Sequence, residues 1–358
     1  MLAETKKVKI EQIKSLPFFF IIGRPRSGTT LLRTLLDAHP NVIIPHESPV
    51  IMNLYSRYRK LQSLTEKDIL RFISDLESQR IFGIWNIDRG EVEKNLLKCE
   101  GGGTYTDLIK VLYACFNSVY DKGKLLLMGD KNPVYSYSFH KIFPIFTEAK
   151  YIHLIRDYRD QVVSIKRMDF EMSNPALVAW RWKKSLEEVM TFAKKYPGRF
   201  LLLKYESLVQ NPEREMAKVT NFLGIPYDDK VFDFYKIENE DEFLPANAIE
   251  KYHQSLLKPV STQSVNRWET QLNNSEIAAA EWIAGRTGQK AGYTVSGTKM
   301  KGLWYLKYLP FSFYGMVWNT MRKITFVLPF GWRKLIWKYS PVLPRVLKRK
   351  NGKQSNGN

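Results

Sequence analysis

Residues 17–40 read PFFFIIGRPRSGTTLLRTLLDAHP, and they give the strongest indication of the fold. Its beginning, Phe18–Ile22, is a continuous apolar run, which is typical of a strand buried on both faces of a parallel sheet. Its end, from Gly28 to Ala38, is predicted to be a helix. A buried strand that leads through a glycine-containing turn into a helix is characteristic of α/β domains, and such a turn often binds an anion.

The same alternation continues along the chain. Further buried strands are predicted at Val42–Ile44, Leu125–Met128, Tyr151–Ile155 and Phe200–Leu203. Helices are predicted near Gly28–Ala38, Glu66–Glu77, Thr106–Val119, Tyr158–Met168, Ala176–Lys194 and Pro212–Phe222. This order predicts a three-layer, P-loop-like α/β fold, in which helices flank a central parallel sheet. Ligands bind such sheets beyond the carboxyl ends of the strands, so the residues after each run are the candidate site.

The turn between the first strand and its helix carries groups that bind anions. Backbone N–H groups in such a turn point into a common pocket, and the helix adds the positive end of its dipole. An Arg guanidinium and several hydroxyl groups supply further donors. The predicted ligands of the anion are Arg26, Ser27, Gly28, Thr29 and Thr30.

The spacing of this turn almost matches the Walker A pattern G-x4-G-K-[ST], with Thr29 in the place of the Lys. In nucleoside-triphosphate enzymes that Lys neutralises the β- and γ-phosphates together with Mg²⁺. Its absence predicts a donor that has less charge at its reacting end and that is handled without a metal. A P-loop kinase-like enzyme is the alternative, and Thr29 disfavours it.

A second anion site is predicted where the Tyr151–Ile155 run ends. Arg156 follows the run directly, Asp157 is a suitable helix N-cap, and Ser164 lies two turns along the next helix. Two anion sites on successive parts of one sheet suit a nucleotide that is phosphorylated at both ends. His153, inside the run, is expected to be a core residue rather than a catalyst.

Residues 24–42, RPRSGTTLLRTLLDAHPNV, resemble the 5′-phosphosulfate-binding loop of sulfotransferases that use 3′-phosphoadenosine 5′-phosphosulfate (PAPS). The nearest branch contains the tyrosylprotein sulfotransferases and prokaryotic relatives, and the resemblance covers about residues 17–293. It implies that the chain transfers a sulfuryl group from PAPS to a hydroxyl group of a glycan, lipid, phenol or peptide. It also implies that no metal takes part.

The same resemblance assigns four further residues to the donor. Arg156 and Ser164 match the pair that holds the 3′-phosphate of PAPS. Tyr205 matches a Tyr that the family places beside the nucleotide. Arg267 matches a basic residue in the loop that closes over the donor.

Two adjacent residues after the second run, His46 and Glu47, can accept the proton of an acceptor hydroxyl. Neighbouring side chains in extended chain point to opposite sides, so only one is expected to face the acceptor. The resemblance favours Glu47, because the tyrosylprotein branch has a Glu twenty-one residues after the loop Arg, here Arg26; His46 is the alternative. The resemblance also assigns Lys131, two residues before Pro133, to stabilisation of the transition state.

Two positions depart from the family pattern. The tyrosylprotein branch has a Ser shortly before a Lys-Pro-Val run, and this chain has Tyr252 and His253 near that point. A family Arg four positions after Ser164 is Met168 here. Arg167, beside it, is the candidate replacement.

The composition is that of a folded protein with an anionic partner. Of the 358 residues, 44% are hydrophobic, and the formal net charge is +19 at pH 7. A non-catalytic polyanion-binding protein is therefore a further alternative, although no nucleic-acid-binding motif is present. The two cysteines, Cys99 and Cys115, form no disulfide framework, and the first sixteen residues lack a signal-peptide pattern. No membrane span and a cytoplasmic location are expected.

The charge is concentrated at the C-terminal end. Three segments are expected: an N-terminal extension (1–16), a catalytic domain (17–298) and a basic, aromatic, helical C-terminal segment (299–358). From Lys301 onward there are twelve Lys or Arg, four Trp and no Asp or Glu, and residues 345–358 are expected to be disordered. Prolines, beginning with Pro310, are expected to break the segment into short helices. These helices either bind an anionic membrane surface or pack on the catalytic domain.

The residues between Ser48 and Lys124 connect the candidate base to the strand before Lys131, so they are expected to shape the acceptor pocket. They include the aromatic residues Tyr55, Tyr58, Phe82 and Trp85. The sequence does not choose among a sugar, a phenol, a lipid headgroup and a peptide as acceptor.

Overall fold

The computed structural model of the protein describes residues 10–79, 81–168, 171–236, 254–325, 328 and 331–332. The chain divides into two compact units. The first, called the sheet unit, comprises Met1–Ile155 and Thr191–Ser261. The second, called the helical unit, comprises Arg156–Met190 and Thr262–Asn358. The domain boundaries expected after residues 16 and 298 stay a prediction.

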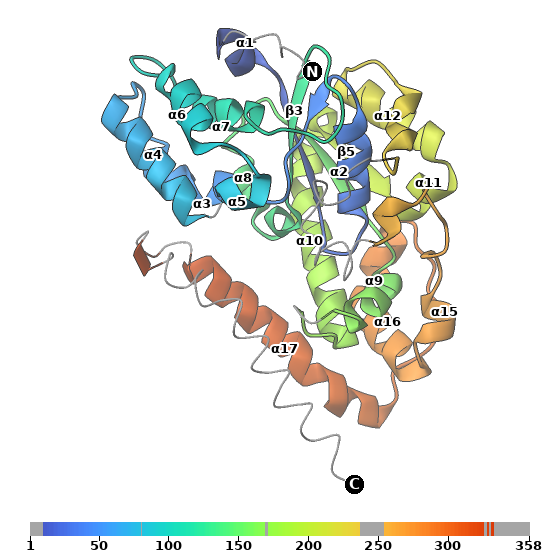
Figure 1. Ribbon diagram of the computed structural model, residues 1–358. Coiled ribbons are helices and arrows are strands. Elements are labelled where there is room, and N and C mark those ends of the chain that lie inside the picture. Colours follow the sequence, from blue (N-terminus) through green and yellow to red (C-terminus); the bar gives the residue numbers. More distant parts are fainter. Residues whose placement is uncertain are drawn as a thin grey trace. The chain divides into compact units, whose positions relative to one another are not determined.

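The sheet unit is built on five strands: β1 (Phe18–Gly23), β2 (Val42–Ile43), β3 (Leu127–Lys131), β4 (Lys150–Ile155) and β5 (Phe200–Lys204). Their order is β2-β3-β1-β4-β5, and all neighbouring pairs are parallel. Figure 1 labels β3 and β5 of this sheet, with α2 (Thr29–Ala38) and α12 (Pro212–Leu223) beside them. The predicted α/β fold with a central parallel sheet is confirmed. From central β1 the chain passes to β2 on one side and later to β4 on the other. Ligands bind at such a switch point in the strand order.

The two faces of the sheet are covered by different kinds of side chain. On one face, Phe19 of β1 belongs to a largely aliphatic core that includes residues of α2 and α12. On the other face the core is aromatic, and the Phe20 ring stacks on the Tyr151 ring with centroids 5.3 Å apart. Successive side chains of a strand point to opposite faces, so β1 anchors both cores.

Further helices of the sheet unit are α1 (Ile10–Ser15), α3 (Val50–Tyr58), α4 (Glu66–Ser78), α5 (Ile81–Trp85), α6 (Arg89–Leu97), α7 (Tyr105–Ala114), α8 (Phe139–Ile142) and α11 (Tyr205–Gln210). Short 3-10 helices lie at Pro133–Tyr137, Pro197–Arg199, Asp229–Asp233 and Gln254–Leu257. Of the helices between β2 and β3, the sequence predicted α4 and α7. Both begin with a capping box, in which Thr65 and Thr104 are the N-cap residues. In each box the Thr side chain accepts the backbone N–H of the third helical residue, an Asp, and the carboxylate of that Asp accepts the backbone N–H of the Thr.

Two of the aromatic residues between Ser48 and Lys124, Tyr58 and Trp85, are core residues. Tyr58 and Trp85 have relative exposures of 0% and 1%. The Tyr58 hydroxyl donates to the Asp75 carboxylate at 2.7 Å, and the Trp85 indole N–H donates to the backbone oxygen of His46 at 2.8 Å. The polar atoms of both rings are therefore satisfied inside the protein.

The helical unit contains α9 (Tyr158–Lys166), most of α10 (Pro175–Lys195), α15 (Trp268–Gln271), α16 (Asn274–Lys290) and α17 (Gly302–Thr325). Helix α17 continues through Pro310, which was expected to break the segment. Pro310 is exposed, and water there can satisfy the carbonyl group that has lost its N–H partner. No helix within the described ranges is long and apolar enough to cross a membrane.

Candidate active site

In the sheet unit, the candidate residues lie at or just beyond the carboxyl ends of the strands. The turn Arg24–Gly28 follows β1, and Tyr205 follows β5 directly. Lys131 is the last residue of β3, and Glu47 comes four residues after the end of β2. The carboxyl ends of parallel strands lie at one edge of a sheet, so this edge collects an anion-binding turn, a cation and a carboxylate.

The turn after β1 is tight and has an unusual backbone. The N–H of Ser27 donates to the backbone oxygen of Arg24 at 3.2 Å, and the Ser27 side chain is fully buried. Arg26 adopts a φ of 70°, a left-handed conformation that costs a non-glycine residue on the order of 1 kcal/mol. Backbone strain of this kind clusters at functional sites, so it supports a binding role for the turn.

Gly28 joins this turn to helix α2 and lies directly under an aromatic ring. Its φ is 91°, and a Cβ atom added there would lie 2.4 Å from Cδ2 of Tyr205. As the N-cap of α2, Gly28 offers no side chain to the first N–H groups of the helix. These groups and the positive dipole end favour an anion at this position. The structure therefore brings Tyr205 against the predicted phosphate-binding turn.

Lys131 and Glu47 form an ion pair. Lys131 Nζ lies 2.6 Å from Glu47 Oε2. The Lys131 side chain is 6% exposed, whereas the Glu47 side chain is 43% exposed. The cation is thus held inside the protein, and the carboxylate that neutralises it is open to solvent.

His46 is in a very different environment from its neighbour. Its ring packs edge-to-face against Phe116, with centroids 5.4 Å apart. Burial, and then the charges of Arg33 and Lys131, lower the pKa of His46 to about 2. An imidazole with so low a pKa takes up a proton poorly at neutral pH, which favours Glu47 as the base.

A buried ion pair that the sequence analysis missed connects α2 to the segment after β2. Arg33 and Asp37, four residues apart on α2, are 3.1 Å apart and almost fully buried. Arg33 Nε donates to the backbone oxygen of Ile44 at 2.9 Å, and Asp37 Oδ1 accepts from the N–H of Ile44 at 3.3 Å. This pair holds the chain just before Glu47. Its signal in the sequence is the i, i+4 spacing of opposite charges in an otherwise uncharged helix.

Asp130, next to Lys131 on β3, is a second buried carboxyl group near the site. It is 1% exposed, and its Oδ1 accepts from the Tyr113 hydroxyl at 3.0 Å. Burial, which outweighs the Tyr113 hydrogen bond, raises the pKa of Asp130 to about 7, and the charge of Glu47 adds to this effect. Asp130 is therefore partly protonated near neutral pH.

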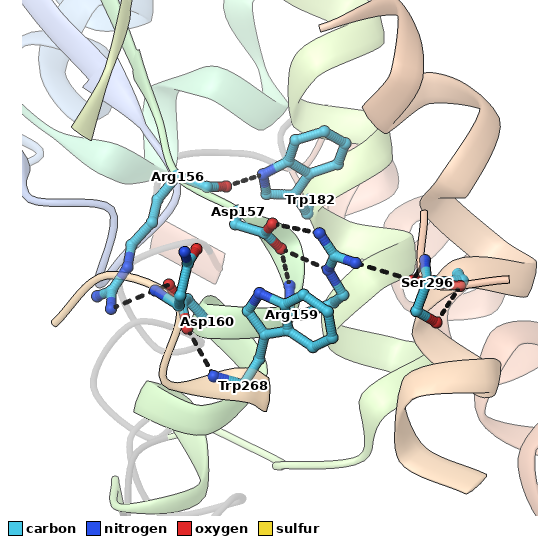
Figure 2. Close-up of polar contacts among 9 residues, drawn as sticks. Arg156, Asp157, Arg159, Asp160, Trp182, Trp268 and Ser296 are labelled. Atoms are coloured by element: carbon cyan, nitrogen blue, oxygen red, sulfur yellow. Dashed lines mark hydrogen bonds and ion pairs between the residues drawn. The ribbon is translucent and has the colours of Figure 1, made fainter. Parts of the chain in front are cut away.

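In the helical unit, Arg156 and the turn that carries Arg267 meet at one carboxylate. Asp160 Oδ2 lies 4.0 Å from the Arg156 guanidinium (Figure 2). The guanidinium also donates to the backbone oxygen of Ser264. The same carboxylate accepts the N–H groups on either side of Arg267, from Asn266 at 2.8 Å and from Trp268 at 2.9 Å. Asp160 thus ties together two of the predicted donor-binding residues.

Ser164 lies on the same side of α9 as this carboxylate. The two residues are four positions apart on the helix, and residues at that spacing are neighbours on one face. Ser164 is half-buried. The predicted N-cap is confirmed, since the Asp157 side chain accepts the N–H of Arg159 at 2.8 Å.

Arg159 is a buried residue whose role the sequence analysis missed. It donates to Asp157 through two nitrogens, at 3.0 and 2.7 Å, and to Glu281 of α16 at 2.9 Å (Figure 2). Its guanidinium lies 3.7 Å from the centroid of the Trp268 ring. Arg159 therefore fixes α9 to α15 and α16, next to the residues held by Asp160.

Comparison with known proteins identifies the family. A model described as "Sulfotransferase family" matches residues 17–229, more than half of the chain. The chain belongs to the sulfotransferase family. Protein-tyrosine sulfotransferase A of Caenorhabditis elegans is 29% identical over 281 residues, which are 75% of this chain and 65% of that protein. The protein-tyrosine sulfotransferase of Drosophila melanogaster is 25% identical over 269 residues, 72% of this chain and 48% of that protein. The chain thus spans about half to two thirds of these relatives.

Solved sulfotransferase domains share the fold of this family member. The sulfotransferase domain of the olefin synthase of Synechococcus PCC 7002 has a TM-score of 0.54 and 21% identity, covering 77% of this chain and 94% of that domain. The sulfotransferase domain of the curacin biosynthetic pathway has a TM-score of 0.52 and 19% identity, covering 78% and 99%. At these identities the likeness concerns the fold.

This sulfotransferase-family chain departs from the tyrosylprotein pattern at two positions, and the structure describes one of them. Met168 is buried, and Arg167 beside it is exposed and donates to the Gln271 side chain at 3.1 Å. Tyr252 and His253 lie outside the described residues. Within the described ranges, no group of three or more His, Cys, Asp or Glu side chains is placed to hold a metal ion.

Proposed function

We propose that this protein transfers a sulfuryl group from PAPS to the hydroxyl group of an acceptor. The observation that supports this most strongly is the contact of Glu47 with Lys131 at 2.6 Å. Sulfuryl transfer needs a group that removes the acceptor's proton and a cation that stabilises the leaving oxygen. Lys131 pairs in register with Ile21 of β1, the strand that leads into the anion-binding turn, so all three parts lie on neighbouring strands.

The donor's two anionic ends suit the two groups of predicted ligands. In this proposal the 5′-phosphosulfate binds the turn after β1, whose ligands are Arg26, Ser27, Gly28, Thr29 and Thr30. The 3′-phosphate binds Arg156 and Ser164 of the helical unit, and Arg267 adds a further cation. Tyr205, whose ring packs on Gly28, lies beside the nucleotide.

The reaction follows from the roles of the two paired side chains. Glu47 accepts the proton of the acceptor hydroxyl as the oxygen attacks sulfur, and Lys131 donates a hydrogen bond to the oxygen that leaves sulfur. A Lys ammonium has three N–H donors, so it can bind Glu47 and an oxygen of the donor together. We assign proton acceptance to Glu47 rather than His46, because the low pKa of His46 makes it a weak base.

The acceptor and the location belong to the same proposal. The curated relatives are named protein-tyrosine sulfotransferases, so peptide tyrosines are the first acceptors to test, followed by glycans, lipids and phenols. We also propose a cytoplasmic location, in keeping with two buried thiols, Cys99 and Cys115. Contact with the inner face of the membrane through residues 299–358 is part of this proposal.

The direct test is incubation of the full chain with ³⁵S-labelled PAPS and fractionated acceptors. We expect label in one acceptor class, and Glu47→Gln should lower kcat at least about 100-fold. The same variant should bind 3′-phosphoadenosine 5′-phosphate (PAP), the product nucleotide, within about threefold of the parent. An active Glu47→Gln together with an inactive His46→Asn would reverse the assignment of the base. Tight binding of ATP with no binding of PAP would refute the donor.

A further inference from the structure

Helix α17 has one packed face and one exposed face. On the packed face, Tyr308 is 1% exposed and belongs to a small core with Ala176 and Ala279. A Cβ atom added to Gly315, on the same face, would lie 2.8 Å from the Trp180 ring, so the helix approaches α10 closely there. Among the described residues, these contacts attach α17 to the helical unit through this face.

The opposite face of α17 carries exposed apolar side chains from Leu303 to Ile324. Its large side chains are between 41% and 80% exposed: Leu303, Leu306, Leu309, Phe313, Met316, Val317, Met321 and Ile324. Their three- and four-residue spacing places them in one stripe along the helix. A 24-residue helix is about 36 Å long. Scattered apolar residues are normal on a surface, but a continuous stripe of this length marks an interaction site.

The charge of the C-terminal sequence indicates what the stripe binds. From Lys301 to the end, the chain has twelve Lys or Arg and no Asp or Glu. Lys301, directly before α17, and Lys307 on α17 are exposed. Nearby, Trp282 of α16 and Tyr305 of α17 are each 39% exposed and pack edge-to-face at 5.2 Å. Partly exposed aromatic residues and cations beside an apolar helix face are typical of elements that lie in the headgroup region of a bilayer.

A second copy of the chain fits this surface less well than lipid does. Pairing two α17 stripes would cover their apolar side chains. It would also bring together two segments that carry only positive charge, which repel each other. An anionic bilayer offers an apolar interior for the stripe and negative headgroups for the cations.

We infer that the exposed face of α17 docks on the surface of an anionic membrane, lying along it. This inference names the part of the C-terminal segment that makes the contact and does not depend on the donor or acceptor chemistry. The stripe enters the boundary between headgroups and acyl chains, and the Lys and Arg residues bind the headgroups.

The test is co-sedimentation of the full chain with vesicles of phosphatidylcholine containing about 30% phosphatidylglycerol. The parent protein should bind these vesicles, and Leu306→Ser/Phe313→Ser should bind at least about tenfold more weakly. Both side chains are more than 60% exposed, so the variant should keep its melting temperature. Leu70→Ser, which removes an exposed leucine from α4, is the matched control and should bind like the parent.

Four results would overturn the inference. The first is failure of the parent to bind the vesicles, and the second is equal binding by the double variant. The third is equal binding of the parent to vesicles of pure phosphatidylcholine, which would show that charge does not contribute to binding. The fourth is a dimer, seen without lipid by analytical ultracentrifugation, that the double substitution converts to a monomer.

Discussion

The contact between Gly28 and Tyr205 gives the most quantitative prediction about the anion-binding turn. In Gly28→Ala, the new Cβ would lie 2.4 Å from the Tyr205 ring, so either the ring or the turn must move. Overpacking of this kind typically costs about 1–3 kcal/mol. A φ of 91° adds about 1–2 kcal/mol for a residue that has a Cβ atom. The expected loss of stability is about 2–5 kcal/mol.

Thermal unfolding followed by circular dichroism measures this loss. At about 2–4 °C per kcal/mol, the melting temperature should fall by roughly 4–20 °C. The control is Gly198→Ala, because a Cβ added to Gly198 meets nothing within 4 Å. We expect that substitution to change the melting temperature by less than about 2 °C.

A double-mutant cycle separates the two causes. In a Tyr205→Ala background the overlap with the ring is removed, so Gly28→Ala should cost only the backbone part, about 1–2 kcal/mol. An equal cost in both backgrounds would show that the ring does not pack on Gly28. A melting temperature of Gly28→Ala equal to that of the parent would refute the description of the whole turn.

Three further predictions concern single side chains of the site. Lys131→Ala should lower kcat at least about 100-fold with little change in PAP affinity. A kcat equal to that of the parent would show that Lys131 does not stabilise the transition state. Asp160→Asn should raise KM for PAPS about tenfold at unchanged kcat, because the turn around Arg267 loses one backbone hydrogen bond. If the role of Asp160 were purely structural, the substitution would lower the melting temperature and leave KM unchanged. The pKa of Asp130 is raised to about 7 in the folded protein, so the stability it contributes is full below about pH 4 and is lost as pH rises to about 7. Denaturant unfolding from pH 4 to 8 should show that Asp130→Asn flattens this loss, and an unchanged slope would contradict the cause given for the shift.

The fold followed from local sequence patterns. The unbroken run Phe18–Ile22 predicted a strand buried on both faces, and β1 is such a strand. The five strands and six helices predicted along the chain are all present, with small differences at their ends. Helix α17 was not predicted as one element, because the effect of Pro310 depends on whether its side of the helix is exposed. That information is not contained in the local pattern.

The candidate site was predictable only where it follows strand ends. The turn after β1 and Lys131 were placed correctly at that edge because parallel strands end there. The contact between Glu47 and Lys131 joins residues 84 positions apart in the sequence, so no local pattern indicates it. The same holds for Arg159 and Glu281, which are 122 positions apart. Such pairs depend on how the elements pack, and packing is decided over the whole chain.

The central claim, that one nucleotide binds both the turn after β1 and the Arg156/Ser164 pair, can be tested by calorimetry. PAP and adenosine 5′-monophosphate, which lacks the 3′-phosphate, are titrated into the parent and into Arg156→Ala. We expect PAP to bind the parent at least about tenfold more tightly than the monophosphate, and Arg156→Ala to bind the two nucleotides almost equally. If Arg156→Ala weakened both nucleotides by the same factor, the 3′-phosphate would not bind Arg156, and the proposed donor site would be wrong.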